Sequence, residues 1–208
     1  MKCEWKKAEK NTYLPESEPT IINIAKCKYL TIKGEGNPNS EDFQKRVEAL
    51  YSLSYAIRTM PKSGYTPEGY FEYTVYPLEG IWDLNEQGRK LKTLDKNQLV
   101  YTIMIKQPDF VNDDVFNKAL LKTKTKKQND LLDKVVFEEK EDGLCVQMMH
   151  VGPYDTEAVS FDKIQAFLNL NNLERLDKTH KEIYISDPRK TPADKMKTVL
   201  RCFIKKTN

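Results

Sequence analysis

The sequence runs twice through the same order of elements, and this repetition constrains the fold more than any other feature. In the first half, a strand, a helix and two strands are predicted at residues 20–33, 41–60, 70–77 and 98–106. In the second half, the same elements are predicted at residues 143–150, 157–171, 180–186 and 198–205. A unit of this size cannot easily bury its sheet alone. A duplicated β-α-β-β unit therefore predicts an α+β fold, with helices backing one antiparallel sheet and a central ligand groove.

Helix-capping residues mark where the predicted helices begin. Ser40 precedes the helix over residues 41–60, in which apolar side chains recur three or four positions apart. A further helix is predicted over residues 110–127, with Asn112 or Asp113 as its cap. Each helix is thus expected to pack one face against the sheet.

The chain is expected to form a single domain over residues 1–208. Its pseudo-repeat halves are placed at about 20–128 and 129–206. Residues 1–18 are polar and include Pro15, so they are expected to be an irregular lead-in.

The charge balance and hydropathy argue against several classes of protein. With 34 basic and 31 acidic side chains, the net charge is only +3, so there is no electrostatic case for nucleic acid as a partner. No apolar stretch approaches the roughly 20 residues that span a bilayer, so no membrane association is expected. The N-terminus also lacks the apolar run of a signal peptide. A cytoplasmic protein is therefore predicted.

The residues typical of cofactor and metal chemistry are sparse. The four cysteines show no C-x-x-C spacing, and only two histidines are present, so a zinc site is not expected. No nucleophile elbow and no Gly-rich phosphate loop follow a strand. We therefore expect no metal and no organic cofactor.

The strand over residues 180–186 carries the strongest functional signal. Because side chains alternate along a strand, Glu182 and Tyr184 share one face with His180. Ile183 marks the core face, with Lys181 expected to fray at the start of the strand. A carboxylate beside a phenol could bind a cation or act as a general base for water. The alternative is an ordinary solvated face, which antiparallel sheets often have.

Several other side chains are candidates for ligand contacts. Trp82 follows a proline turn and could stack on a flat or cationic ligand, or it could belong to the core. Tyr55 leans toward one edge of the first helix. Met148 could line an adaptable pocket. His150 is a candidate for the ligand site, although a hydrogen-bonded structural histidine is the alternative, as it is for His180.

Three motifs in the second half resemble the GyrI-like small-molecule-binding domains. They are His150-x-Gly152-Pro153-Tyr154, His180-x-Glu182-x-Tyr184-x-Ser186-Asp187-Pro188 and Lys197-Thr198-Val199-Leu200-Arg201. The segment Pro77-Leu78-Glu79-Gly80-Ile81-Trp82 and the tyrosine-bearing first helix resemble a stand-alone, single-domain bacterial branch of that family. The resemblance covers roughly residues 20–206.

The resemblance implies a function for the acidic position. In related sensor domains, the residue corresponding to Glu182 meets planar, hydrophobic or cationic compounds, which implies multidrug binding. Some stand-alone members resemble cyclopropanoid hydrolases, which add water to the strained ring of genotoxins with a glutamate and a tyrosine. Tyr154 matches the tyrosine of the first motif, and Tyr55, Tyr65 and Tyr184 remain alternatives. The first half offers no second acidic residue at the matching position, so a single carboxylate is expected.

A non-catalytic role is the competing hypothesis. Some relatives are thought to bind another protein, such as DNA gyrase, and a drug-sequestering module is equally compatible with the resemblance. A protein partner predicts an exposed apolar or charged patch, whereas a ligand predicts an aromatic groove around Glu182. Because the repeat takes up residues 20–206, a sensing role coupled to transcription through a DNA-reading helix-turn-helix is not expected.

Overall fold

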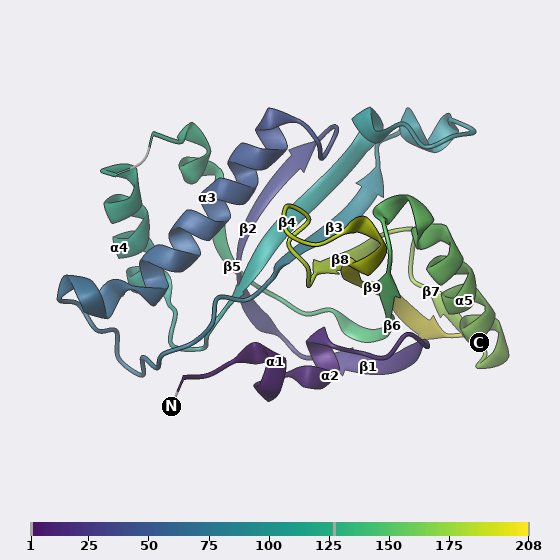
Figure 1. Ribbon diagram of the computed structural model, residues 1–208, viewed down its shortest axis with the longest axis horizontal. Helices are drawn as coiled ribbons and strands as arrows, with labels where there is room; N and C mark the ends of the chain where they lie inside the picture. The colour runs from purple at the N-terminus through teal and green to yellow at the C-terminus, as the bar shows by residue number, and fades with distance from the viewer. Residues whose placement is uncertain (1, 127, 208) are drawn as a thin grey trace. The chain divides into compact units, whose positions relative to one another are not determined.

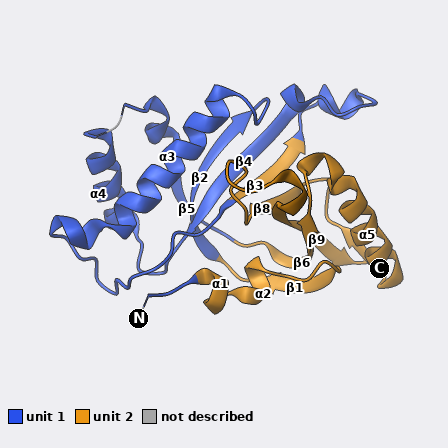
Figure 2. Ribbon diagram, viewed as in Figure 1, with its two compact units in different colours: residues 1–4, 27–78, 84–140 blue, residues 5–26, 79–83, 141–208 orange. Residues whose placement is uncertain are grey.

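The structure is a computed structural model that describes residues 2–126 and 128–207, and its chain divides into two compact units (Figure 1, Figure 2). Of these residues, unit 1 contains those in 1–4, 27–78 and 84–140, and unit 2 contains those in 5–26, 79–83 and 141–208. Both units combine antiparallel strands with helices, which confirms the predicted α+β class. Residue 127, the predicted end of one helix, lies outside the described residues.

Unit 1 is built on strand β2 (Cys27–Glu35). This strand pairs antiparallel with β4 (Leu99–Gln107) on one side and with β5 (Val136–Lys140) on the other. The helices are α3 (Glu41–Arg58) and α4 (Asp113–Lys124), with short 3₁₀ turns at Met60–Ser63, Gly88–Lys90, Lys96–Gln98 and Asp130–Lys134. Helix α3 buries one apolar face, as its periodicity predicted.

The predicted helix caps in unit 1 are confirmed. The Ser40 hydroxyl accepts a hydrogen bond from the backbone N–H of Phe43 at the start of α3. Of the two residues considered for α4, Asn112 is the cap, because its side chain accepts from the backbone N–H of Val115. These bonds satisfy backbone donors that a helix start otherwise leaves without partners.

Unit 2 contains a sheet whose strands run in the order β1, β6, β9, β8 and β3. Their bounds are Thr20–Ile24, Gly143–Val151, Lys197–Lys206, His180–Tyr184 and Leu78–Leu84, of which residues 79–83 belong to this unit. The short β7 (Leu173–Arg175) pairs with β9, and a 3₁₀ turn at Ala193–Lys195 precedes β9. All pairings within this unit are antiparallel.

Helix α5 (Glu157–Leu170) covers one face of the unit 2 sheet. The apolar side chains between them form a continuous buried cluster of Val146, Met148, Ile164, Leu168, Leu173, Leu200, Cys202 and Ile204. The cluster residues of β6 and β9 occupy every second position of their strands. Gln147 and Arg201, which lie between them, therefore point to the opposite face of the sheet.

The N-terminal segment covers that opposite face, contrary to the expected irregular lead-in. It forms the short helices α1 (Trp5–Ala8) and α2 (Lys10–Tyr13), whose Trp5 and Tyr13 rings are buried with centroids 5.2 Å apart. Backbone carbonyls of α2 accept hydrogen bonds from side chains of the sheet, at 2.7 Å for Gln147 and 3.0 Å for Arg201. Aromatic burial, rather than helix length, holds this segment in place.

Two predicted strands differ from the structure. The single strand expected over residues 20–33 is two strands, with β1 in unit 2 and β2 in unit 1. The strand expected over 70–77 is absent from this described stretch, and β3 starts only after Pro77, which lacks the N–H of a ladder donor. The β, α, β, β order nevertheless occurs as β2-α3-β3-β4 and again as β6-α5-β8-β9, where the three-residue β7 is inserted between α5 and β8.

A glycine in β2 is required by the side chain opposite it. Gly34 pairs with Tyr101 of β4, and the Tyr101 ring lies directly over it. A Cβ atom at Gly34 would lie only 2.5 Å from that ring. The ring also packs edge-on against Phe43 with centroids 5.1 Å apart, so it cannot move aside freely.

No helix in the described part of the chain is both long enough and apolar enough to cross a membrane.

Candidate functional site

The candidate site is a set of side chains on one face of β8 and its neighbour β3. We call it the Glu182 cluster, and it comprises His180, Glu182 and Tyr184 of β8 with Trp82 of β3. Trp82 lies directly opposite His180 in the antiparallel register, and Glu182 lies opposite Leu200 of β9. The cluster therefore shares its face with the apolar residues under α5.

Hydrogen bonds hold the Glu182 carboxylate on both of its oxygens. The Tyr184 hydroxyl donates to Glu182 Oε2 at 2.8 Å, and His180 Nε2 lies 3.0 Å from Oε1. Trp82 Nε1 donates to the Tyr184 oxygen at 2.9 Å. An indole N–H only donates, so the single proton of Tyr184 is directed at Glu182. The carboxylate is thus held in one orientation and remains reachable, with 13% of its side chain exposed.

The prediction that Lys181 frays at the start of this strand is wrong. Its side chain is completely buried on the opposite face of β8 and forms ion pairs with Glu79 and Asp142. A lysine in the interior is tolerated because carboxylates neutralise its charge there. Strand β8 therefore has a charged interior face and a partly open face that carries Glu182.

Tyr154 lies beside this carboxylate. It starts the 3₁₀ turn Tyr154–Thr156, the residue is 38% exposed, and its ring stands perpendicular to that of Tyr184 with centroids 6.0 Å apart. Burial, and then the negative charge of Glu182, raises the pKa of Tyr154 to about 12. The phenol therefore keeps its proton at neutral pH and can donate it.

A second carboxylate belongs to the same surroundings, contrary to the single carboxylate expected. Glu157, the first residue of α5, is buried with 8% of its surface exposed. Burial and the charge of Glu182 raise the pKa of Tyr184 well above its usual value, and the charge of Glu157 adds to this rise. The same charge acts on Tyr154. The sequence signal was a glutamate three residues after the tyrosine of the first motif, where α5 begins.

His150 connects the turn that carries Tyr154 to helix α5. Its Nδ1 lies 2.9 Å from the Ser160 hydroxyl, and its Nε2 lies 3.2 Å from the Pro153 carbonyl oxygen and 3.3 Å from the Thr156 hydroxyl. Gly152 adopts φ 140° next to the ring, a conformation that favours glycine. The buried His150 thus orients the turn, and Met148 lies in the core beneath α5.

His180 is packed from its other side by α5. The Phe161 ring meets the His180 ring edge-on, with centroids 4.9 Å apart, and the Arg175 guanidinium lies 5.9 Å from the Phe161 centroid. Phe161 therefore limits the movement of the imidazole that contacts Glu182.

The remaining predicted site residues, Tyr55 and Tyr65, belong to unit 1. Tyr55 is 48% exposed on α3, with the Tyr51 ring 6.3 Å away. The Tyr65 hydroxyl donates to Asp114 of α4 at 3.1 Å, and the Lys118 ammonium lies 5.1 Å from its ring centroid. Among the described residues, no group of three or more His, Cys, Asp or Glu side chains is arranged to hold a metal ion.

The fold is that of a family of small-molecule-binding domains. Residues 17–202 match the family described as the GyrI-like small molecule binding domain. The chain belongs to this family. No curated protein matches the chain.

Solved structures agree with this assignment. A hydrolase from Listeria innocua is 33% identical, with a TM-score of 0.89 over 98% of this chain and 100% of that one. An uncharacterized conserved protein from Listeria innocua is 36% identical, with a TM-score of 0.90 over 98% of this chain and 100% of that one. The C-terminal domain of EcmrR is 13% identical, with a TM-score of 0.54 over 91% of this chain and 98% of that one, which is a likeness of fold alone.

Proposed function

We propose that this protein binds hydrophobic, planar or cationic small molecules at the Glu182 cluster and adds water to cyclopropane-bearing genotoxins. The observation that carries the proposal is the Glu182 carboxylate, which is 13% exposed, hydrogen-bonded to Tyr184 and His180, and beside the protonated phenol of Tyr154. A base and a proton donor on one small surface are what the addition of water to a strained ring requires.

Electrostatics at the site favour a cationic or electron-poor ligand. Glu182 and Glu157 both act on the phenols of Tyr154 and Tyr184, so negative charge is concentrated there. The half-exposed Tyr154 ring offers a face for stacking, which contributes about 0.5–2 kcal/mol when the ligand is a cation. Trp82, with only 5% of its surface exposed, acts chiefly through its bond to Tyr184.

The proposed reaction uses Glu182 as the general base and Tyr154 as the donor. Glu182 removes a proton from water while the water oxygen bonds to a carbon of the cyclopropane ring. The ring C–C bond breaks, and its electron pair moves toward a conjugated oxygen of the substrate. Tyr154 gives its proton to that oxygen, and the proton on Glu182 returns to the phenolate through solvent. Stabilising the oxygen as its charge grows lowers the barrier.

The similarity to a hydrolase from Listeria innocua supports the catalytic form of the proposal. That protein is 33% identical over 98% of this chain, a likeness that extends well beyond the fold.

The test is a mass-spectrometric turnover assay with a cyclopropane-bearing genotoxin, run with the intact protein and with Glu182→Gln. The variant keeps the side-chain size but loses the base, so we expect turnover to fall by about 10²–10⁴-fold while calorimetry still detects binding. Binding without turnover by the intact protein would overturn the hydrolytic part and leave a sequestering module. If neither binding nor turnover is observed, the competing role as a protein-interaction partner is favoured.

A further inference from the structure

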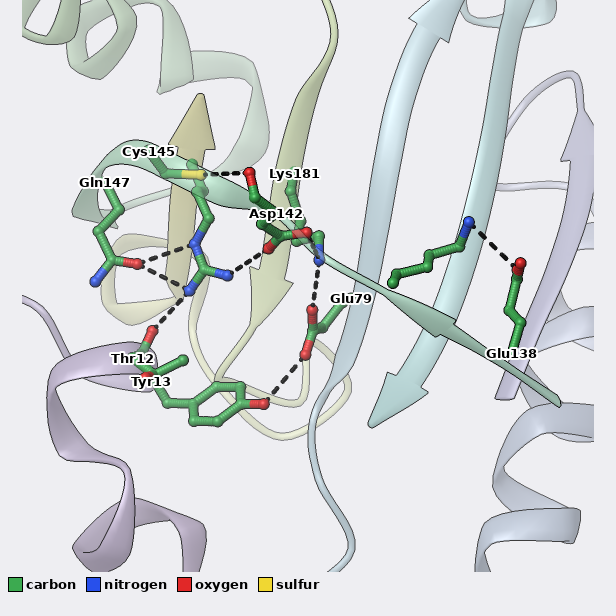
Figure 3. A network of polar contacts seen from close by, with 10 residues as sticks. Thr12, Tyr13, Glu79, Glu138, Asp142, Cys145, Gln147 and Lys181 are labelled. Carbon is green, nitrogen blue, oxygen red and sulfur yellow. Dashed lines mark hydrogen bonds and ion pairs between the residues drawn. The ribbon is translucent and has the colours of Figure 1, made fainter. Parts of the chain in front are cut away.

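Four charged side chains are buried together on the face of β8 opposite to Glu182 (Figure 3). We call them the buried ion cluster, and they are Glu79, Asp142, Lys181 and Arg201. Between 0% and 4% of each side chain is exposed. Two cations and two carboxylates balance one another, as buried charges must.

Asp142 connects the two cations of the buried ion cluster. Its Oδ1 lies 2.7 Å from Lys181 Nζ, and its Oδ2 lies 2.8 Å from Arg201 Nη1. Lys181 Nζ also lies 3.2 Å from Glu79 Oε2. Burial would raise the pKa of Asp142, but the attraction of Lys181 and Arg201 outweighs it, so the pKa is below its usual value. The Asp142 carboxylate is therefore ionised at neutral pH.

Neighbouring polar groups complete the buried ion cluster. The Tyr13 hydroxyl donates to Glu79 Oε1 at 3.2 Å, and Figure 3 shows this phenol pointing at the carboxylate. Arg201 donates to Gln147 Oε1 at 3.0 and 2.9 Å and to the Thr12 carbonyl oxygen at 3.0 Å. The N-terminal segment thus closes the cluster from outside.

The pair Lys181–Glu79 joins the same two strands as the pair Tyr184–Trp82. Lys181 and Tyr184 come from β8, and Glu79 and Trp82 come from β3. One pair lies on the interior face and the other on the face of Glu182. The register between these strands extends only from Glu79↔Ile183 to Trp82↔His180, so the two side-chain contacts add to a short backbone ladder.

The positive charge of Lys181 favours one register of β8 over its neighbours. A shift of β8 by one residue would exchange its faces. It would remove Lys181 from between two carboxylates and bring Glu182 or His180 toward them. A third carboxylate against Glu79 and Asp142 would be uncompensated, which costs several kcal/mol in a buried site. The observed register places there a lysine, which is charged at neutral pH without needing to gain a proton.

We propose that Lys181 is a positioning residue for Glu182. By pairing with Glu79, it aligns β8 with β3 so that Trp82 orients the Tyr184 hydroxyl toward the Glu182 carboxylate. The proposal rests on the proposed function, because it takes Glu182 as the working base. Its structural half, the alignment of β3 with β8, is measurable without turnover.

Two double variants separate alignment from stability. Glu79→Gln with Lys181→Met removes the pair between β3 and β8 and keeps Asp142–Arg201. Asp142→Asn with Arg201→Met removes the other pair and keeps Lys181–Glu79. Each double variant deletes one cation and one carboxylate, so the buried charge stays balanced in both. Glu79→Gln alone is the milder variant, since Gln retains the shape and can still accept from Tyr13.

Kinetics and fluorine NMR are the readouts. The chain has two tryptophans, so protein labelled with 5-fluorotryptophan should give two resonances, with Trp5 assigned from a Trp5→Phe variant. In the Glu79→Gln/Lys181→Met variant, we expect the Trp82 resonance to shift or split. We expect kcat to fall about 10–100-fold at unchanged KM, measured where circular dichroism shows the variant folded.

The matched control is expected to behave differently. Asp142→Asn/Arg201→Met should lower the melting temperature yet keep the kcat and the Trp82 resonance of the intact protein. Equal losses of kcat in both double variants would contradict the proposal. So would a Glu79→Gln/Lys181→Met variant in which both the Trp82 resonance and kcat are unchanged.

Two further outcomes are also decisive. If a double variant does not fold, Glu79→Gln alone is expected to change kcat and the Trp82 resonance in the same direction but by less. No change in that folded variant would overturn the positioning role. If the intact protein shows no turnover, the proposed function fails, and the Trp82 resonance alone decides whether Lys181 aligns the strands.

Discussion

Lys181 and Glu182 are neighbours in strand β8, yet their charges lie in opposite environments. The Lys181 side chain is 0% exposed and enclosed by carboxylates, whereas Glu182 is 13% exposed and surrounded by hydrogen-bond donors. Burial makes the first charge costly to leave without a partner. Partial exposure leaves the second free to meet a ligand. The two faces show how one short strand can combine a fully buried ion pair with a partly exposed carboxylate.

The largest effect is expected from removing the interior charge alone. Lys181→Met leaves Glu79 and Asp142 buried with a single cation, which should lower the free energy of unfolding by about 3–5 kcal/mol. Chemical denaturation measures this difference. The control is Lys205→Met, because Lys205 pairs with Glu174 at 3.1 Å but is 56% exposed. That change should cost no more than about 1 kcal/mol, and equal losses in both variants would show that burial does not distinguish them.

On the open face, the largest effect should be on rate and not on stability. Tyr154→Phe removes the hydroxyl whose pKa, raised to about 12, keeps it protonated. We expect turnover of the genotoxin to fall about 10–1,000-fold with little change in melting temperature. Steady-state kinetics and a thermal melt check this expectation. A similar loss in Tyr65→Phe would point to a general effect of removing exposed phenols.

A smaller effect is expected at the edge of the interior face. Tyr13→Phe removes the donor to Glu79 and leaves a buried carboxylate with one hydrogen bond fewer. Because this bond is long, at 3.2 Å, a loss of about 1–2 kcal/mol is expected. Urea denaturation would measure it. An unchanged midpoint would show that the N-terminal segment contributes nothing to the buried ion cluster.

The last prediction concerns Asp142 and how stability changes at acid pH, an effect that is not seen at neutral pH. The folded-state pKa of Asp142 is below its unfolded value, mainly because Lys181 and Arg201 outweigh the opposing effect of burial. Its contribution is therefore fully present above the ordinary Asp pKa of about 3.9 and is lost as the pH falls through the lower folded-state value. Melting temperatures between neutral and acid pH should show this decline. The melting temperature of the Asp142→Asn variant should be lower at neutral pH and should fall less as the pH is lowered. Parallel curves for the variant and the intact protein would contradict this role of Asp142.

The elements that the sequence predicted well are those with strong local signals. The apolar spacing and the Ser40 cap located α3, and alternation located β4, β6 and β9. The α1–α2 segment was missed because two four-residue helices have no measurable periodicity. Its stability comes from burial of Trp5 and Tyr13, which local patterns do not reveal.

In the candidate site, too, local relations were predictable and long-range contacts were not. Strand alternation correctly placed Glu182 beside Tyr184, because that relation is local. The burial of Lys181 was not predictable, since its carboxylate partners come from distant segments, Glu79 in β3 and Asp142 before β6. Glu157 was overlooked because a glutamate in the first turn of a helix is common on exposed surfaces. Long-range pairing of charges is therefore what the sequence alone concealed.

The most direct test of the central claim is turnover of a cyclopropane-bearing genotoxin in ¹⁸O-labelled water. The intact protein is expected to incorporate ¹⁸O at the opened ring carbon. Glu182→Gln should bind the compound but incorporate no label above the uncatalysed rate, and its melting temperature should stay close to that of the intact protein. Equal incorporation by both proteins would contradict the assignment of Glu182 as the base on the open face of β8.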